Sequence, residues 1–287
     1  LCGFTLTNGH TGAVEGDQYE IQYGSKGGGA LLSGGGTLSN CIVIGCSAFD
    51  NGGGVACYCG GALTACLIRD NTSTAFGGGV VAEYGGAVID NCVLTANTGG
   101  SGGGLAMFFA GIIATRCAIT NNDAGGGGGV YIENDCFLDR CAVIGNRATY
   151  EGGGIRTYAG GTLAQCTILR NTTDSDGGGI HSYNATVDSC LIAQNTAGGN
   201  GGGVWAFGWR IRNSTITSNS AELGGGIYTY YGSPRIANSV AYHNTSRVSG
   251  TDIYQFGDPG IISYTCSPGL GGGGNISSAP EFIDIAN

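Results

Sequence analysis

Apolar and polar residues alternate along many short stretches of this chain. Residues Val130–Glu133, like the segments that follow other glycine triplets, have apolar side chains at every second position, which is the period of a β-strand. No segment shows the 3.6-residue apolar spacing of an amphipathic helix. The pattern therefore predicts an all-β chain of short strands.

The alternating segments recur at a nearly fixed interval. Glycine triplets begin every 25 residues from Gly27 to Gly177, and two more begin at Gly201 and Gly224. Two other columns of residues keep the same phase, one mostly of cysteine and one of asparagine five positions later. The cysteine column is Cys41, Cys66, Cys92, Cys117, Cys141, Cys166 and Cys190, followed by Ser214 and Ser239. The asparagine column is Asn71, Asn97, Asn122, Asn146, Asn171, Asn195, Asn219 and Asn244, with Cys46 in the same column. Three columns in phase indicate a repeat architecture.

Repeats of about 25 residues, each with three short strands, predict a parallel β-helix of about ten coils. The glycines then occupy turns that need a positive φ or leave no room for Cβ. The cysteines fill a narrow interior, and the asparagines form a hydrogen-bonded ladder along the axis. Residues 1–256 are expected to form one β-helix domain with an insertion at 9–26. Residues 257–287 are expected to be an irregular segment that caps the same domain.

The repeat of Gly-Gly-Gly-Val/Ile and Ile-x-x-Asn resembles the right-handed parallel β-helix repeats of bacterial surface proteins, within the broad pectin-lyase-like superfamily. It is similar to the repeats of chlamydial polymorphic membrane proteins, which carry Gly-Gly-Ala-Ile and Phe-x-x-Asn. Here Ile68, Leu94 and Ile119 stand in place of that Phe. The resemblance implies a right-handed coil, secretion and often adhesion, and it implies no catalytic residue.

Composition narrows the possible partners. The net charge is −9 and Lys26 is the only lysine, which argues against nucleic acid and against anionic lipid as partners. The longest apolar run, residues 105–114, is too short to span a bilayer. The first residue is Leu rather than Met, which suggests a processed form or a fragment of a longer protein. Together with the resemblance, this predicts an extracellular or bacterial cell-surface protein.

The outward positions of the strands after the glycine triplets carry an aromatic strip. In each of these strands the first and third residues are expected to point inward, and the second and fourth outward. Exposed apolar strips of this size are rare on soluble monomers without a use. The predicted ligand or partner contacts are Tyr131, Arg156, Tyr158, His181, Tyr183, Trp205, Phe207, Tyr228, Tyr230, Tyr254 and Phe256.

Three interpretations of this strip remain open. The rings could stiffen an exposed sheet or be covered by the chain's own terminal segment. They could form an interface between subunits or within a fibre, where Tyr, Trp and Phe dominate the energetics. They could also stack on a glycan. The sequence favours a secreted or surface-displayed structural and adhesive protein, whose partner would be itself, by head-to-tail or lateral contact, or a glycan. The alternative is a carbohydrate-binding or lyase-like polysaccharide-degrading β-helix.

Catalysis is the less favoured interpretation. Arg156 and His181 on adjacent coils would offer a lyase a charge neutraliser and a base. Glu83 and Glu133, two coils apart, have the spacing of an inverting hydrolase. Both glutamates are nevertheless expected to be solvated, with nothing to raise their pKa. No catalytic residue and no cofactor is predicted.

An acidic turn provides the one candidate for a metal site. Glu151, Asp174 and Asp176 fall on neighbouring coils and superficially resemble a calcium loop, but the glutamate that would close such a loop is missing. We interpret the cluster as a solvated acidic turn, with calcium as the alternative.

Modification and thiol chemistry give two further expectations. Among the Asn-x-Ser/Thr sequons, Asn184, Asn213 and Asn275 are the candidates for exposed glycosylation sites. The column cysteines are expected to stay reduced, because the strand spacing of about 4.8 Å exceeds the Cβ separation of a disulfide.

Overall fold

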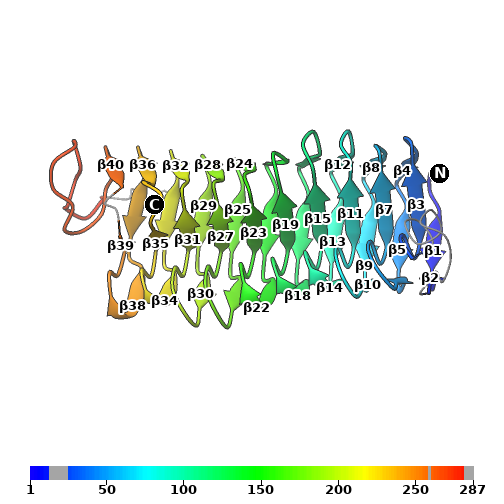
Figure 1. Cartoon of the computed structure of the whole chain (residues 1–287), viewed down its shortest axis with the longest axis horizontal. Coiled ribbons are helices and arrows are strands. Elements are labelled where there is room, and N and C mark those ends of the chain that lie inside the picture. The colour runs from blue at the N-terminus through cyan, green and yellow to red at the C-terminus, as the bar shows by residue number, and fades with distance from the viewer. Residues whose placement is uncertain (13–24, 258–259, 281–287) are drawn as a thin grey trace, which may run out of the picture.

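The computed structural model describes residues 1–12, 25–257 and 260–280, and its coils stack along one axis into a rod (Figure 1). The described residues form forty strands and no helix. Each coil contributes one strand to each of four parallel sheets of ten strands, rather than the three strands per coil that the repeat predicts. The all-β class and the stacked, in-register coils of the prediction are confirmed.

Sheets 1 and 2 follow one another around the coil. Sheet 1 contains β1 (Thr5–Thr7), β5 (Ile42–Ile44), β9 (Leu67–Arg69), β13 (Val93–Thr95), β17 (Ala118–Thr120), β21 (Ala142–Ile144), β25 (Thr167–Leu169), β29 (Leu191–Ala193), β33 (Thr215–Thr217) and β37 (Val240–Tyr242). Sheet 2 contains β2 (His10–Thr11), β6 (Ser47–Ala48), β10 (Thr72–Ser73), β14 (Thr98–Ser101), β18 (Asp123–Gly126), β22 (Arg147–Glu151), β26 (Thr172–Thr173), β30 (Thr196–Ala197), β34 (Ser220–Leu223) and β38 (Thr245–Ser249). The strands of sheet 2 are the ones that the sequence pattern missed, because several have only two residues and show no apolar alternation.

Sheets 3 and 4 complete the coil. Sheet 3 follows the glycine triplets and contains β3 (Ala30–Ser33), β7 (Val55–Tyr58), β11 (Val80–Glu83), β15 (Leu105–Phe108), β19 (Val130–Glu133), β23 (Ile155–Tyr158), β27 (Ile180–Tyr183), β31 (Val204–Phe207), β35 (Ile227–Tyr230) and β39 (Ile253–Phe256). Sheet 4 contains β4 (Thr37–Ser39), β8 (Ala62–Thr64), β12 (Val88–Asp90), β16 (Ile113–Thr115), β20 (Phe137–Asp139), β24 (Thr162–Ala164), β28 (Thr186–Asp188), β32 (Arg210–Arg212), β36 (Arg235–Ala237) and β40 (Ile261–Ser263).

The coils stack in register, so that equivalent residues of successive repeats lie side by side. Val80 pairs with Val55 on one side and with Leu105 on the other. The inward side chains of all four sheets form one hydrophobic cluster along the rod. From β7 to β35, the first and third residues of the sheet 3 strands, such as Val130 and Ile132, are buried, which confirms their inward orientation.

The glycine triplets are required by close backbone approach. The first glycine, for example Gly152, has a φ of +68°. A Cβ atom on the second, Gly153, would lie 2.5 Å from the carbonyl oxygen of Gly178 in the next coil. A Cβ atom on the third, Gly154, would lie 2.8 Å from Nδ2 of Asn171. All three positions therefore exclude a side chain through close contacts, and the first also needs a positive φ.

The asparagine ladder runs through the interior beside these triplets. Asn146 accepts hydrogen bonds from the backbone N–H (2.9 Å) and Nδ2 (3.0 Å) of Asn122, and its own Nδ2 donates to Asn171 Oδ1 at 3.0 Å. The same pattern repeats from Asn71 to Asn244. The last rung is Asp252, whose carboxylate accepts from the N–H (3.0 Å) and Nδ2 (2.9 Å) of Asn244. The predicted ladder is confirmed, and its acidic end at Asp252 was not predicted.

The column cysteines are buried at the corner between sheets 4 and 1. The backbone N–H groups of Cys66, Cys117 and Cys166 each donate to the sulfur of the next cysteine, at 3.3–3.4 Å. All thirteen cysteines lie in the described part of the chain, and all are free thiols.

The described C-terminal residues continue the coil before they become irregular. β40 pairs with β36, and the backbone of Cys266 forms isolated parallel β-bridges with Val240 and with Ile276. Asn275 Oδ1 accepts a hydrogen bond from the N–H of Thr265 at 3.0 Å. Most of the predicted insertion, residues 13–24, lies outside the described residues.

Candidate functional site

The outer face of sheet 3 is the predicted contact surface, and the glycine turns beside it shape that face. The second-position side chains point away from the interior, yet four of the predicted contact residues among them are only 1–8% exposed: Tyr131, His181, Trp205 and Tyr228. They lie over the turn formed by the glycine triplets. A Cβ atom at Gly177, for instance, would lie 2.8 Å from Cβ of His181. The expectation that these four side chains are exposed is wrong, because the side-chain-free turn leaves a recess that they fill.

These second-position rings stack on one another along the rod. The ring of His181 lies 4.2 Å from that of Trp205, with an interplanar angle of 8°. Trp205 and Tyr228 follow at 6.5 Å and 14°, and Tyr228 and Tyr254 at 5.5 Å and 10°. The column therefore spans four successive coils, and its inner rings present their faces to each other.

The fourth-position rings form a second, more exposed column. We call Tyr158, Tyr183, Phe207, Tyr230 and Phe256 the aromatic surface. Tyr158, Tyr230 and Phe256 are 51%, 38% and 41% exposed, whereas Tyr183 and Phe207 are half-buried. The rings of Tyr230 and Phe256 stack at 5.5 Å with an interplanar angle of 4°. This surface lies on the C-terminal half of sheet 3.

The charged and titratable groups around His181 on this face are paired or neutral. Glu151 Oε2 lies 2.9 Å from Arg156 Nη2 and 3.8 Å from His181 Nδ1. Burial, reinforced by the positive charge of Arg156, lowers the pKa of His181 to about 3, so its ring is neutral at neutral pH. Burial, reinforced by the charge of Glu133, raises the pKa of Tyr131 to about 12. Neither His181 nor Tyr131 has a pKa suited to proton transfer near neutral pH.

A buried charged cluster lies on the N-terminal half of the same face. Lys26 Nζ lies 2.5 Å from Glu83 Oε2, and Asn51 Nδ2 donates to Glu83 Oε1 at 2.8 Å. Glu83 is therefore buried and paired. The expectation from the sequence that it is solvated is wrong. Sequence reasoning did not connect Lys26 with Asn51. The signal was available, because each residue directly precedes a glycine triplet and they are one repeat apart.

The three carboxylates of the calcium hypothesis have different partners. Asp174 pairs with Arg147 at 2.7 Å, Glu151 pairs with Arg156, and Asp176 Oδ1 accepts from the N–H of Asn200 at 2.6 Å. The described residues contain no group of three potential metal ligands. The geometry thus gives the calcium alternative no support.

The glycosylation candidates differ in exposure. Asn184 and Asn213 are exposed and stay predictions. Asn275 is half-buried, because its side chain bonds to Thr265 and to the carbonyl oxygen of Ile262, so the expectation of an exposed amide is wrong there.

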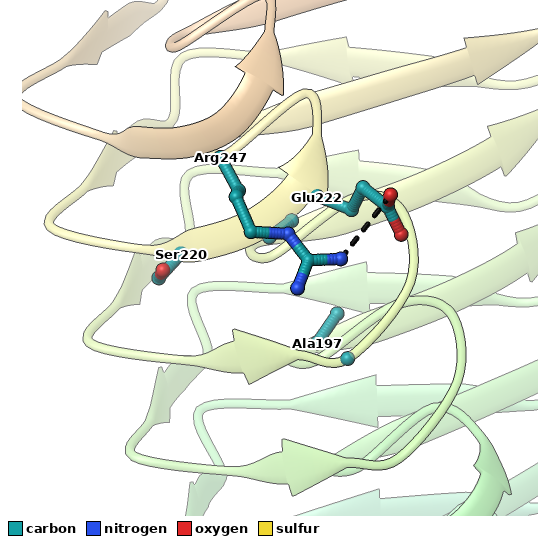
Figure 2. A pocket seen from close by; sticks show the side chains of 6 residues that line it. Ala197, Ser220, Glu222 and Arg247 are labelled. Atoms are coloured by element: carbon teal, nitrogen blue, oxygen red, sulfur yellow. Dashed lines mark ion pairs between the residues drawn. The ribbon is translucent and has the colours of Figure 1, made fainter.

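A shallow pocket of about 230 Å³ lies on sheet 2, away from the aromatic surface (Figure 2). Arg247 reaches across it to Glu222, and the two side chains form an ion pair at 3.2 Å. The remaining lining consists of small residues of β30 and β34 and the glycine that directly follows β30: Ala197, Gly198, Ser220 and Ala221. The ion pair is the only charged pair in this pocket, and sequence reasoning did not single it out.

Comparison with known proteins shows to which family this chain belongs. The described residues contain no helix that is long and apolar enough to cross a membrane. Neither the curated proteins nor the solved structures contain a significant match to this chain. The family model described as the right-handed beta helix region matches residues 53–221, which is more than half of the chain. This match supplies the handedness that the sequence resemblance implied, and the chain belongs to the right-handed β-helix family.

Proposed function

We propose that this protein is a structural and adhesive β-helix, secreted or displayed on a bacterial cell surface, and that the aromatic surface of sheet 3 is its contact with a second copy of the chain. The observation that carries the proposal is the continuity of this surface. Three of its rings are more than one-third exposed and lie on one sheet within about five coils. Rigid aromatic rings contribute large contact areas to interfaces at low cost in side-chain entropy.

Ring orientation favours a protein contact over a glycan platform. A sugar stacks on the open face of a ring, whereas Tyr230 and Phe256 use faces to stack on each other. Edges of such rings can still pack against apolar side chains of another protein. The paired charges and the neutral His181 on the same sheet also favour a structural role over acid–base catalysis.

The test compares two triple variants of the full chain. Tyr158→Ser, Tyr230→Ser and Phe256→Ser together remove the most exposed rings of the aromatic surface. The matched control replaces Val88, Ile113 and Phe137 of sheet 4 by Ser, and these three are 40–42% exposed. Sedimentation velocity should show association of the wild type and the control, and loss of association only in the aromatic-surface variant.

Two outcomes would overturn the proposal. One is a wild-type chain that stays monomeric at high micromolar concentration. The other is binding of oligosaccharides with a change in Trp205 fluorescence, abolished in the aromatic-surface variant, which would support the carbohydrate-binding alternative. Protease accessibility of the protein on intact cells tests the proposed location separately.

A further inference from the structure

Lys26, Asn51 and Glu83 form a cluster whose chemistry goes beyond an ion pair. The amine of Lys26 and the carboxamide of Asn51 contact opposite oxygens of one carboxylate, at 2.5 Å and 2.8 Å. Asn51 and Glu83 are each less than a tenth exposed, and the Lys26 side chain is 10% exposed. An amine nucleophile, a carboxylate and a carboxamide are therefore held together and away from water.

The carboxamide carbonyl is also polarised. Asn51 Oδ1 accepts a hydrogen bond from the backbone N–H of Phe76 at 3.1 Å. A fixed N–H group at this oxygen would stabilise the negative charge that develops there when a nucleophile adds to Cγ. The ring of Tyr58, 8% exposed, lies 5.5 Å from Lys26 Nζ and forms part of the apolar surroundings.

We propose that Lys26 and Asn51 form an intramolecular isopeptide bond, with Glu83 as the proton-transfer group. Glu83 takes a proton from the Lys26 ammonium, and the neutral amine attacks Cγ of Asn51 to form the new C–N bond. Proton transfer through Glu83 to the amide nitrogen of the tetrahedral intermediate allows the original C–N bond to break. The ammonium and the carboxamide thus become a secondary amide and a released ammonium ion, and Glu83 ends as a carboxylate.

The repeat explains why these two residues meet. Lys26 and Asn51 occupy the same position on successive coils, immediately before the glycine triplets, and the N–H of Gly27 donates to the carbonyl oxygen of Asn51 at 3.0 Å. The bond would therefore link two adjacent coils covalently at the point where the residue 9–26 insertion rejoins the helix. Proximity of this kind replaces a bimolecular reaction by an intramolecular one.

The composition of the chain makes the test simple. Lys26 is the only lysine, so a protease that cleaves after unmodified lysine cuts the denatured free chain once. After incubation of the folded chain, we expect no cleavage and an intact mass lower by one ammonia. Cleavage into residues 1–26 and 27–287 at the full sequence mass would overturn the proposal, as would the mass gain that accompanies hydrolysis of Asn51 to Asp.

Variants assign the role of each group. Glu83→Gln and Asn51→Ala should both restore the full expected mass and cleavage at Lys26. Glu133→Gln, which changes a half-buried carboxylate on the same face two coils away, should keep the mass loss. A Glu83→Gln chain that still loses ammonia would exclude the proton-transfer role. Succinimide formation at Asn51-Gly52 would lose the same mass but would leave Lys26 open to cleavage. The wild-type mass and the resistance of Lys26 to cleavage therefore decide the bond together, whether or not the variants fold.

Discussion

Trp205 shows how a side chain can be outside the hydrophobic interior and still be buried. Its ring stacks between His181 and Tyr228 beside the glycine turn and is 7% exposed. We expect Trp205→Ser to lower the free energy of unfolding by roughly 3 kcal/mol, because the packing of both neighbours is lost. Tyr158→Ser, at an exposed ring, should cost less than about 1 kcal/mol. Urea denaturation measures both, and equal losses would contradict the burial of Trp205.

His181 should make stability depend on pH. Its pKa is about 3 in the folded chain and about 6.5 in the unfolded chain, so the unfolded state gains the proton first as the pH falls. Stability is therefore full above pH 6.5 and falls towards pH 3, with a loss of about 2 kcal/mol from this group by pH 5. His181→Phe, which keeps a ring against Trp205, should lose less stability between pH 7 and pH 5. An identical pH dependence would mean that His181 is accessible to protons in the folded chain.

The asparagine ladder joins each coil to the next through side chains, in addition to the four sheets. Asn146→Ala would leave the N–H and Nδ2 of Asn122 and the carbonyl oxygen of Ile119 without their partner. Each such group costs about 1–3 kcal/mol, so we expect a loss of roughly 3 kcal/mol or more in the free energy of unfolding.

Asn121→Ala is the matched control for the ladder. Asn121 is exposed at a corner with a φ of +54°, and the equivalent corner of the preceding coil is Ala96 with a φ of +53°. Alanine is therefore already accommodated in this geometry, and the control should cost less than about 1 kcal/mol. If both variants lose similar stability in urea, the ladder does not hold the coils together as described.

At the scale of strands and turns, the sequence predicts the repeating columns of glycine, asparagine and inward apolar residues better than it predicts the turns. The positions of the glycine triplets, of Asn146 and of inward residues such as Ile132 follow from a repeat that only one stacking can satisfy. The two-residue strands of sheet 2, such as Thr72–Ser73, carry no apolar signal and were missed. The recess that buries Trp205 also went unpredicted. It lies at Gly201 of the same coil, where an added Cβ atom would be 2.7 Å from the backbone nitrogen of Trp205.

Across the whole molecule, the thirteen free thiols should differ sharply in reactivity. Only Cys2 and Cys59 are exposed. The hydrogen bond with the next cysteine, together with burial, raises the pKa of Cys92 and Cys117 to about 12, so they hold little thiolate at neutral pH. A thiol reagent should therefore modify two cysteines rapidly in the folded chain and all thirteen in denaturant. Fewer than thirteen in denaturant, without reductant, would reveal disulfides.

The candidate site could be predicted only in part at this scale. Alternation placed Tyr158, Tyr230 and Phe256 correctly on the outer face of sheet 3. The contact of Lys26 with Glu83 depends on a side chain reaching across coils, and the local pattern does not encode it. Asn275 was expected to be exposed, but its side chain bonds to Thr265. The sequence does not reveal this contact, because it forms only once Cys266 has paired with Val240.

Asp252, the last acceptor of the ladder, determines where the rod can be lengthened. Each ladder amide donates once to the acceptor of the next rung and once to a carbonyl oxygen of the preceding coil, as Asn244 does to Asp252 and to Ile216. The last acceptor has no further rung to donate to, and a carboxylate accepts without donating. A duplicated repeat inserted between Asn71 and Asn244 would extend the ladder with all its donors and acceptors matched. The same repeat inserted after Asp252 would follow a carboxylate, already only 5% exposed, that has no N–H to donate to the next ladder acceptor. Changes in length, by gene duplication or by engineering, should therefore be tolerated upstream of this aspartate and rejected beyond it.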